Sequence, residues 1–271
     1  MLGKLIKHDF KTAARQFVPL FIFVILITPL TRFSFWFSDY IQNHMPEYSE
    51  YLDIIPGTVI FSYYATMIVC ATATSVILIV NFYRSMVTRE GYLTHTLPVT
   101  TLELISSKTI VSVIWTILSV LVCILSILIL VISTDNVSDV SQCITSMLED
   151  FKFQNIGMTV AVFIELLVLS IASIVFSYAK VFLCISIGQS MKDHKLLSSI
   201  GLYFAFNVLQ RFIGSFLMLF VTLFISNFAS MKFEQLTTFL VLPCSILLMC
   251  AIDAGLLAVT NLMFKKHLNL Q

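Results

Sequence analysis

Residues 110–132 decide the class of this chain, and they read IVSVIWTILSVLVCILSILILVI. The segment contains no Asp, Glu, Lys or Arg, and most of its side chains are apolar. An α-helix rises 1.5 Å per residue, so about 20 apolar residues cross a hydrocarbon layer of roughly 30 Å. We therefore expect residues 110–132 to span a membrane as a helix.

Five further stretches have the same length and character. They cover approximately residues 18–37, 58–82, 157–187, 198–226 and 239–264. The longest connection between them has about 25 residues, which is too few for a separate folded domain. The predicted fold is all-α: residues 1–271 form a single polytopic membrane domain with six transmembrane helices.

The overall composition agrees with this class. Hydrophobic residues make up 58% of the chain and charged residues 11%, and the mean hydropathy is +0.96. A soluble domain carries about 25% charged residues. A soluble fold, a disordered chain and a nucleic-acid-binding domain are all disfavoured, because each needs charge that is missing here.

The distribution of Lys and Arg predicts the orientation. Eleven of them lie on the side that holds both termini, and three lie on the other side. The first group comprises Lys4, Lys7, Lys11, Arg15, Arg84, Arg89, Lys108, Lys192, Lys195, Lys265 and Lys266, and the second comprises Arg32, Lys152 and Lys232. Because basic loops stay inside, both termini are expected to be cytoplasmic.

The first 17 residues have the pattern of an amphipathic helix. Apolar side chains recur at helical spacing and four basic residues lie elsewhere on the helical wheel. The apolar positions are Leu2, Leu5, Ile6, Phe10, Ala13 and Phe17. We expect an interfacial helix over residues 1–17, serving as a membrane anchor rather than as a lever against a cytoplasmic partner.

The connection between the second and third spans is unusually apolar for a loop. Gly91 permits a break in the backbone, Pro98 stops the preceding segment, and Thr100 or Thr101 can cap a new helix with Glu103 in its first turn. The pattern predicts a short helix, a turn and a helix leading into the third span. Its apolar side chains suit a contact with another protein, and the alternative is a re-entrant or self-packed loop.

Residues 137–151, in a loop on the opposite side, also have helical spacing. Two interpretations are equally supported. The segment is either a surface helix that caps a pathway or a loop helix that only packs on the spans.

Motifs for several kinds of chemistry are absent from the sequence. It contains no Gly-x-x-x-x-Gly-Lys-Ser/Thr, no His-Glu-x-x-His and no Gly-x-Ser-x-Gly, and its five histidines are scattered over separate loops. We therefore expect no catalytic residue, no metal site and no cofactor in this chain, and no binding of ATP by the chain alone.

Polar or ionisable residues inside the predicted spans include Glu165, Lys180, Asn207, Gln210, Arg211 and Asp253. Such groups are costly in lipid and usually face a bundle interior or a wet cavity. Estimated depths place Glu165 near Arg211, with Arg32 also within reach, and place Asp253 near Lys180. The groups either line a substrate path or pair structurally between helices, and we favour structural pairing.

Three segments carry a resemblance to a known family: residues 82–99 (FYRSMVTREGYLTHTLPV), 185–197 (ISIGQSMKDHKLL) and 265–270 (KKHLNL). With the six spans, they resemble bacterial permease subunits of type-2 ABC exporters, of the Gram-positive, clostridial type that includes exporters of amphipathic peptides. The resemblance implies a permease in the bacterial plasma membrane and not an enzyme. It also implies a homodimer, or a dimer with a similar chain, bound to two ABC ATPase subunits that carry ATP and Mg²⁺.

The same resemblance assigns contacts with the ATPase subunit. A coupling helix would comprise Glu90, Gly91, Tyr92, Leu93, Thr94, His95, Thr96, Leu97 and Pro98. A second, smaller contact would lie in residues 191–196 and include Lys192, Asp193 and His194. The membrane-dipping helices that such permeases carry between the last two spans are not evident here, because residues 227–238 form a short segment.

Two other functions are compatible with the sequence. An ion-gradient-driven secondary transporter or channel would use Glu165, Arg211 and Asp253 as a relay, although the two halves of the chain show no similarity to each other. A membrane-embedded structural or regulatory subunit would have no transport path. For the exporter, an amphipathic or antimicrobial peptide is the expected substrate by resemblance.

Overall fold

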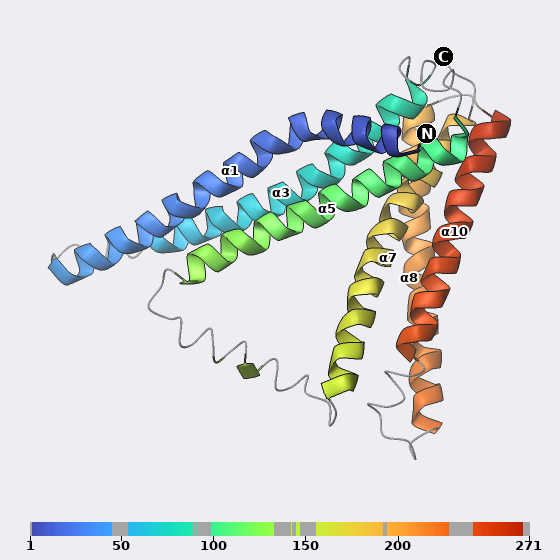
Figure 1. The fold of residues 1–271 in the computed structure, drawn as a ribbon. Coiled ribbons are helices and arrows are strands. Elements are labelled where there is room, and N and C mark those ends of the chain that lie inside the picture. The colour runs from blue at the N-terminus through green and yellow to red at the C-terminus, as the bar shows by residue number, and fades with distance from the viewer. Residues whose placement is uncertain are drawn as a thin grey trace. The chain divides into compact units, whose positions relative to one another are not determined.

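The computed structural model describes residues 2–44, 54–88, 91, 99–132, 142, 145–146, 156–191, 194–227 and 241–267. Within these residues the chain forms long helices: α1 (Leu2–His44), α3 (Ile54–Val87), α5 (Thr101–Ile132), α7 (Ile156–Gln189), α8 (Lys195–Asn227) and α10 (Leu242–His267) (Figure 1). All six are long and apolar enough to cross a membrane. The prediction of an all-helical chain with six such segments is confirmed.

Helix α1 differs from the sequence-based expectation. It runs without a break through residues 17 and 18, where an interfacial helix was expected to end and a span to begin. Phe17, Val24, Thr31 and Ser38 are all buried and recur every seven residues. These residues form one buried stripe along α1 that extends well past residue 17. The helix itself is continuous from Leu2 to His44, even though Pro19 and Pro29 lie inside it.

The chain divides into two compact units. The α1 unit comprises residues 7–78 and 114–150, which include most of α1, the first part of α3 and the second part of α5. The α7 unit comprises residues 1–6, 79–113 and 151–271, which include α7, α8 and α10 with the end of α3 and the start of α5.

An aromatic stack joins two helices of the α1 unit. The Trp115 ring on α5 lies between Phe10 and Phe17 of α1, with ring centroids 4.7 and 4.5 Å away. Phe10 and Phe17 are seven residues apart, so two turns of α1 present both rings to one side chain. Trp115 and Phe17 are buried, and stacked rings of this kind stabilise the contact between the two helices.

A row of hydroxyl groups continues along α5 in the same unit. Ser126 hydrogen-bonds with Thr28 of α1 at 2.6 Å and with the Tyr63 hydroxyl of α3 at 2.8 Å. One heptad earlier, Ser119 hydrogen-bonds with Thr74 of α3 at 2.8 Å. Small hydroxylated residues let membrane helices approach closely and bond to one another. The sequence pattern indicates this row, because Ser119 and Ser126 lie seven residues apart in an otherwise apolar segment and so on the same face of the helix.

The core of the α7 unit lies where α7 packs against its neighbours. Phe176, Ala179 and Leu183 of α7 form a buried cluster with Leu256 of α10. In Figure 1 helices α7, α8 and α10 run side by side, with α8 antiparallel to the other two. At the end of α3, Phe82 stacks on Phe182 with a centroid distance of 3.7 Å. The start of α5 is tied to α10 by a hydrogen bond from Thr101 to Asn261.

The start of α5 confirms the predicted cap. The Thr100 amide donates to Glu103 Oε2 at 3.0 Å, and the Glu103 amide donates to Thr100 Oγ1 at 3.3 Å. This reciprocal pair is a capping box and satisfies two amides that the helix leaves free. The helix leading into the third span thus begins about nine residues before residue 110.

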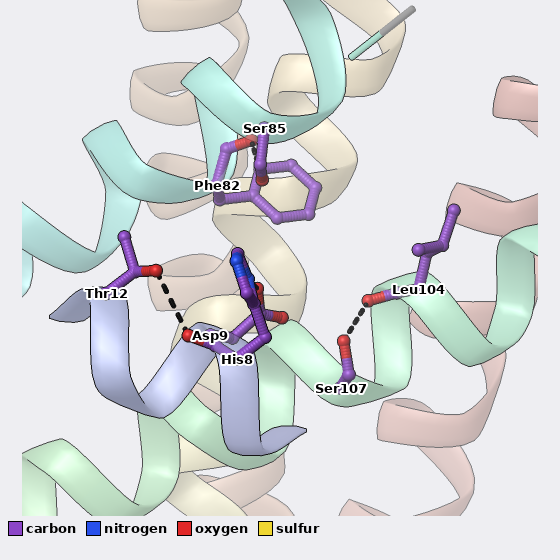
Figure 2. Close-up of polar contacts among 7 residues, drawn as sticks. All are labelled: His8, Asp9, Thr12, Phe82, Ser85, Leu104 and Ser107. Atoms are coloured by element: carbon purple, nitrogen blue, oxygen red, sulfur yellow. Dashed lines mark hydrogen bonds and ion pairs between the residues drawn. The ribbon is translucent and has the colours of Figure 1, made fainter. Parts of the chain in front are cut away.

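Hydroxyl groups within the helices bond mostly to their own backbone. Figure 2 shows this for Thr12, whose hydroxyl donates to the His8 carbonyl at 3.0 Å. In the same figure Ser107 donates to the Leu104 carbonyl at 2.9 Å. In a medium without water such bonds remove the cost of an unsatisfied hydroxyl.

Two predicted features lie largely outside the described residues. Of the expected helix at residues 137–151, the structure describes Gln142, Thr145 and Ser146, and the Thr145 hydroxyl donates to the Gln142 carbonyl at 2.9 Å. The connection between α8 and α10 is described only up to Asn227 and again from residue 241.

Candidate functional site

A buried lysine on α7 forms the most distinctive polar site in the α7 unit. Lys180 is only 7% exposed, and its Nζ donates to Asn207 Oδ1 at 2.8 Å and to Gln210 Oε1 at 2.9 Å. Asn207 and Gln210 are three residues apart on α8, so they lie on the same face. The ammonium is therefore held by two neutral oxygen acceptors from the neighbouring helix.

Two aromatic rings complete the surroundings of the ammonium. The Nζ atom lies 5.5 Å from the Phe176 ring centroid and 5.3 Å from that of Tyr203. Phe176 precedes Lys180 by one turn of α7, and Tyr203 precedes Asn207 by one turn of α8. Cation–π attraction stabilises a charge at these distances, more strongly where water is excluded. We call Lys180, Asn207, Gln210, Phe176 and Tyr203 the lysine cage.

The Asn207 amide is itself oriented by the backbone. Its Nδ2 donates to the Tyr203 carbonyl at 2.8 Å. With the amino group committed to the preceding turn, the carbonyl oxygen of the side chain is directed toward Lys180 Nζ. The cage is thus built from local helix geometry as well as from the contact between α7 and α8.

The expected pairing of Lys180 with Asp253 does not occur. Asp253 on α10 is 7% exposed, and its Oδ1 has no hydrogen-bond partner among the residues that the structure describes. Helix α10 packs against the side of α7 that carries Ala179 and Leu183. Lys180 is about 100° further around α7 than Ala179, so it points to α8 instead.

The expected pairing of Glu165 with Arg211 is also wrong. Glu165 Oε2 is buried without a hydrogen-bond partner in the described part of the chain, and the Arg211 side chain is exposed. Lys180 sets the register of α7 against the antiparallel α8. Glu165 is fifteen residues before Lys180, about 22 Å along α7, while Arg211 is within about 6 Å of the level of the two amides.

The error came from counting depth from opposite ends of two helices. Helix α7 has 34 residues and is about 51 Å long, well over the roughly 30 Å of a hydrocarbon layer. A depth counted from one end of α7 therefore cannot be compared with a depth counted from the opposite end of α8. The side-chain bonds from Lys180 to Asn207 and Gln210 give the register of α7 against α8 directly.

Most of the residues assigned to the coupling contacts lie outside the described residues: Glu90, Tyr92, Leu93, Thr94, His95, Thr96, Leu97, Pro98, Lys192 and Asp193. Gly91 is described, and it is buried, with its amide donating to the Thr88 carbonyl at 2.7 Å. A Cβ atom at Gly91 would lie 2.7 Å from the Met86 carbonyl oxygen. Glycine is therefore needed where the chain leaves α3.

His194 lies at the turn between α7 and α8. Its side chain is exposed, its φ is 52°, and its carbonyl accepts the Ser198 amide at 2.9 Å. Six residues before it, Gly188 packs against Ser199 so closely that a Cβ atom there would lie 2.9 Å from Ser199 Cα. The left-handed turn and the missing side chain let α7 and α8 meet tightly at this end.

Within the described residues, the cage offers an ammonium and amide oxygens, and no group of three His, Cys, Asp or Glu side chains is placed to hold a metal ion. Sequence reasoning found the polar members of the cage but missed Phe176 and Tyr203, because aromatic residues are common in apolar helices.

Comparisons of the chain with protein-family models, with characterised proteins and with solved structures find no match.

Proposed function

We propose that this chain is the membrane subunit of an ATP-driven ABC exporter in a bacterial plasma membrane. The observation that carries the proposal is the segment at residues 82–99, whose sequence resembles the coupling loop of such permeases. The second segment, at residues 185–197, includes the turn between α7 and α8. Both termini are cytoplasmic in this proposal.

The energy source would be a separate protein. The sequence has no phosphate-binding loop, and its short connections leave no room for an ATPase domain. Two ATPase subunits would bind a dimer of this chain, or a dimer of this chain with a similar one. Closure of the ATPase pair on ATP and Mg²⁺ would move the coupling loop and open the path outward. An amphipathic or antimicrobial peptide is the proposed substrate.

Contacts at the end of α3 provide a route for this movement within the α7 unit. Phe82 and Met86 are fully buried there, and the Phe82 ring stacks on Phe182 at an interplanar angle of 7°. Because packed side chains transmit displacements rather than absorb them, a shift of the end of α3 would also move α7. Helix α7 carries Lys180, so the movement would reach the lysine cage.

Replacement of Tyr92 and Leu97 together by Asp tests the coupling contact. Two buried, unpaired charges would cost several kcal/mol at a protein interface, so the variant should reach the membrane but fail to co-purify with an ATPase subunit of about 30 kDa. A matched control places the same two charges on the other loop, with Thr145→Asp and Ser146→Asp. Equal recovery of the ATPase subunit with both variants would assign residues 90–98 to a self-packed loop.

An ion-gradient-driven transporter is the second candidate function. The observation that favours it is Asp253, a buried carboxyl group whose Oδ1 has no partner among the described residues. Ionisable groups in such positions often relay protons. Reconstituted vesicles separate the two functions: the exporter requires the ATPase subunit and ATP, whereas a secondary transporter moves its substrate with a proton gradient alone and loses activity on Asp253→Asn.

A further inference from the structure

Three basic side chains form a row along the first turns of α1. Lys7, Lys11 and Arg15 are spaced four residues apart, and all three are exposed. Each step of four residues turns about 40° around a helix, so the three side chains lie within an arc of about 80°. They all belong to the α1 unit. We call Lys7, Lys11 and Arg15 the basic stripe.

The opposite face of the same segment packs within the protein. Ala13 and Phe17 are buried, and the rings of Phe10 and Phe17 lie against Trp115 of α5. The apolar face of this amphipathic segment is therefore covered by the chain itself and does not rest on lipid. The basic face is the one left to meet another molecule.

The basic stripe has no acidic neighbour on its own face. Asp9 is the one acidic residue among residues 2–17, its side chain is 12% exposed, and its Oδ1 lies 3.9 Å from His8 Nδ1. By helical geometry Asp9 is about 120° or more around α1 from each residue of the stripe. Within the described residues, none of the three cations makes an ion pair. Their charge is thus available to an anionic partner.

The continuation of this face along α1 indicates the nature of the partner. Beyond Arg15 the same side of the helix carries exposed apolar residues: Val18, Ile22, Ile25, Leu26, Phe33 and Trp36. The buried residues Phe17, Val24 and Thr31 lie on the opposite side. The exposed apolar face is about 27 Å long, close to the roughly 30 Å of a hydrocarbon layer. A face of this length and character meets lipid, so its basic end lies at the level of the head groups.

We propose that the basic stripe binds anionic phospholipid head groups in the leaflet on its side of the membrane. Arg15 lies about 5 Å beyond the apolar face, Lys11 about 10 Å and Lys7 about 16 Å. The head-group layer is roughly 5–8 Å thick, and attraction beyond it decays over a Debye length of about 10 Å. The contribution of each cation therefore decreases from Arg15 to Lys7. The contact does not depend on the transport function proposed above.

Native mass spectrometry of the full-length protein, released from nanodiscs with equal amounts of phosphatidylglycerol and phosphatidylcholine, measures this contact. Wild type should retain phosphatidylglycerol preferentially, and the combined change Lys7→Gln, Lys11→Gln and Arg15→Gln should reduce that preference at least about fivefold. Among the single variants, the loss should be largest for Arg15→Gln and smallest for Lys7→Gln.

Arg211→Gln is the matched control for net charge. Arg211 is exposed at the middle of α8, far from the head groups, and its replacement changes the net charge by the same amount as each single variant. It should leave the lipid preference unchanged. An unchanged preference in the triple variant, or an equal loss with Arg211→Gln and Arg15→Gln, would overturn the proposal.

Photocross-linking in native membranes identifies the partner directly. Thr12 is exposed beside Lys11, and Thr12→p-benzoylphenylalanine should cross-link to phospholipid, detected by the mass of the labelled peptide. Cross-linking to a protein instead would reject lipid in favour of an acidic protein surface. Fluorescence of Trp115 in a Trp36→Phe background reports whether each variant keeps the stack between α1 and α5.

Wild-type protein provides a test that needs no substitution. Because the stripe is exposed, added salt should screen it and lower the preference for phosphatidylglycerol. A preference that does not change with salt would contradict a head-group contact at Lys7, Lys11 and Arg15.

Discussion

One buried side chain of the α7 unit, Lys180, bonds helix α7 to helix α8. Lys180 is a charge in an apolar helix, and its two hydrogen bonds and two rings come from α7 and α8 alone. If a buried ammonium loses one acceptor, the free-energy cost of removing it from water remains but is less well compensated. A neutral side chain in its place would not have this cost of burying a charge. The lysine cage therefore stabilises the contact between α7 and α8 only when Lys180 has all of its partners.

This reasoning predicts non-additive effects. Asn207→Leu should lower the free energy of unfolding by about 1–3 kcal/mol, because it leaves the Lys180 ammonium with Gln210 as its one hydrogen-bonded acceptor. Lys180→Met removes the charge, so adding Asn207→Leu to it should cost much less than Asn207→Leu alone. Unfolding of the four proteins in mixed micelles measures this double-mutant cycle, with the exposed Arg211→Leu as the control. Simple addition of the two effects would show that Lys180 and Asn207 are not coupled.

At the scale of the elements, the turn between α7 and α8 depends on a missing side chain. At Gly188 a Cβ atom would overlap Ser199 Oγ and lie 2.9 Å from Ser199 Cα, which is backbone and cannot rotate away. The helices must therefore separate to accommodate any larger residue.

Gly188→Ala should accordingly destabilise the protein by about 1–3 kcal/mol, as overpacking does in other cores. Gly201→Ala is the matched control, since Gly201 lies on α8 with nothing within 4 Å of its Cβ position. That change should be neutral or slightly stabilising, because Ala favours a helix over Gly. Thermal unfolding of the two variants in the same detergent gives the comparison, and equal melting temperatures would contradict the close approach.

Elements could be predicted from the sequence where the signal is local. Length and polarity located all six helices, and the three-residue spacing of Thr100 and Glu103 identified the cap of α5. The partners of Lys180 could not be predicted, because they depend on the register and rotation of α8 against α7, which no local pattern encodes. For the same reason Asp253 and Glu165 were assigned to partners that they do not contact.

At the scale of the whole molecule, charge asymmetry predicts how the chain crosses the membrane. Eleven Lys and Arg residues lie at the ends of the spans that share a side with both termini, against three at the opposite ends. Each basic residue held on the cytoplasmic side adds to the preference for one orientation. The proposed coupling loop and the turn between α7 and α8 both belong to the basic side.

Cysteine labelling in intact cells tests this orientation. In a cysteine-free background, Asn136→Cys and Asn227→Cys should react with a membrane-impermeant maleimide added outside, because both lie on the poorly basic side. Thr94→Cys and Asp193→Cys should react only after the cells are made permeable, which also serves as the control for their intrinsic reactivity. Labelling of Thr94→Cys from outside would place residues 90–98 away from any cytoplasmic ATPase, and the exporter proposal would fail with the orientation.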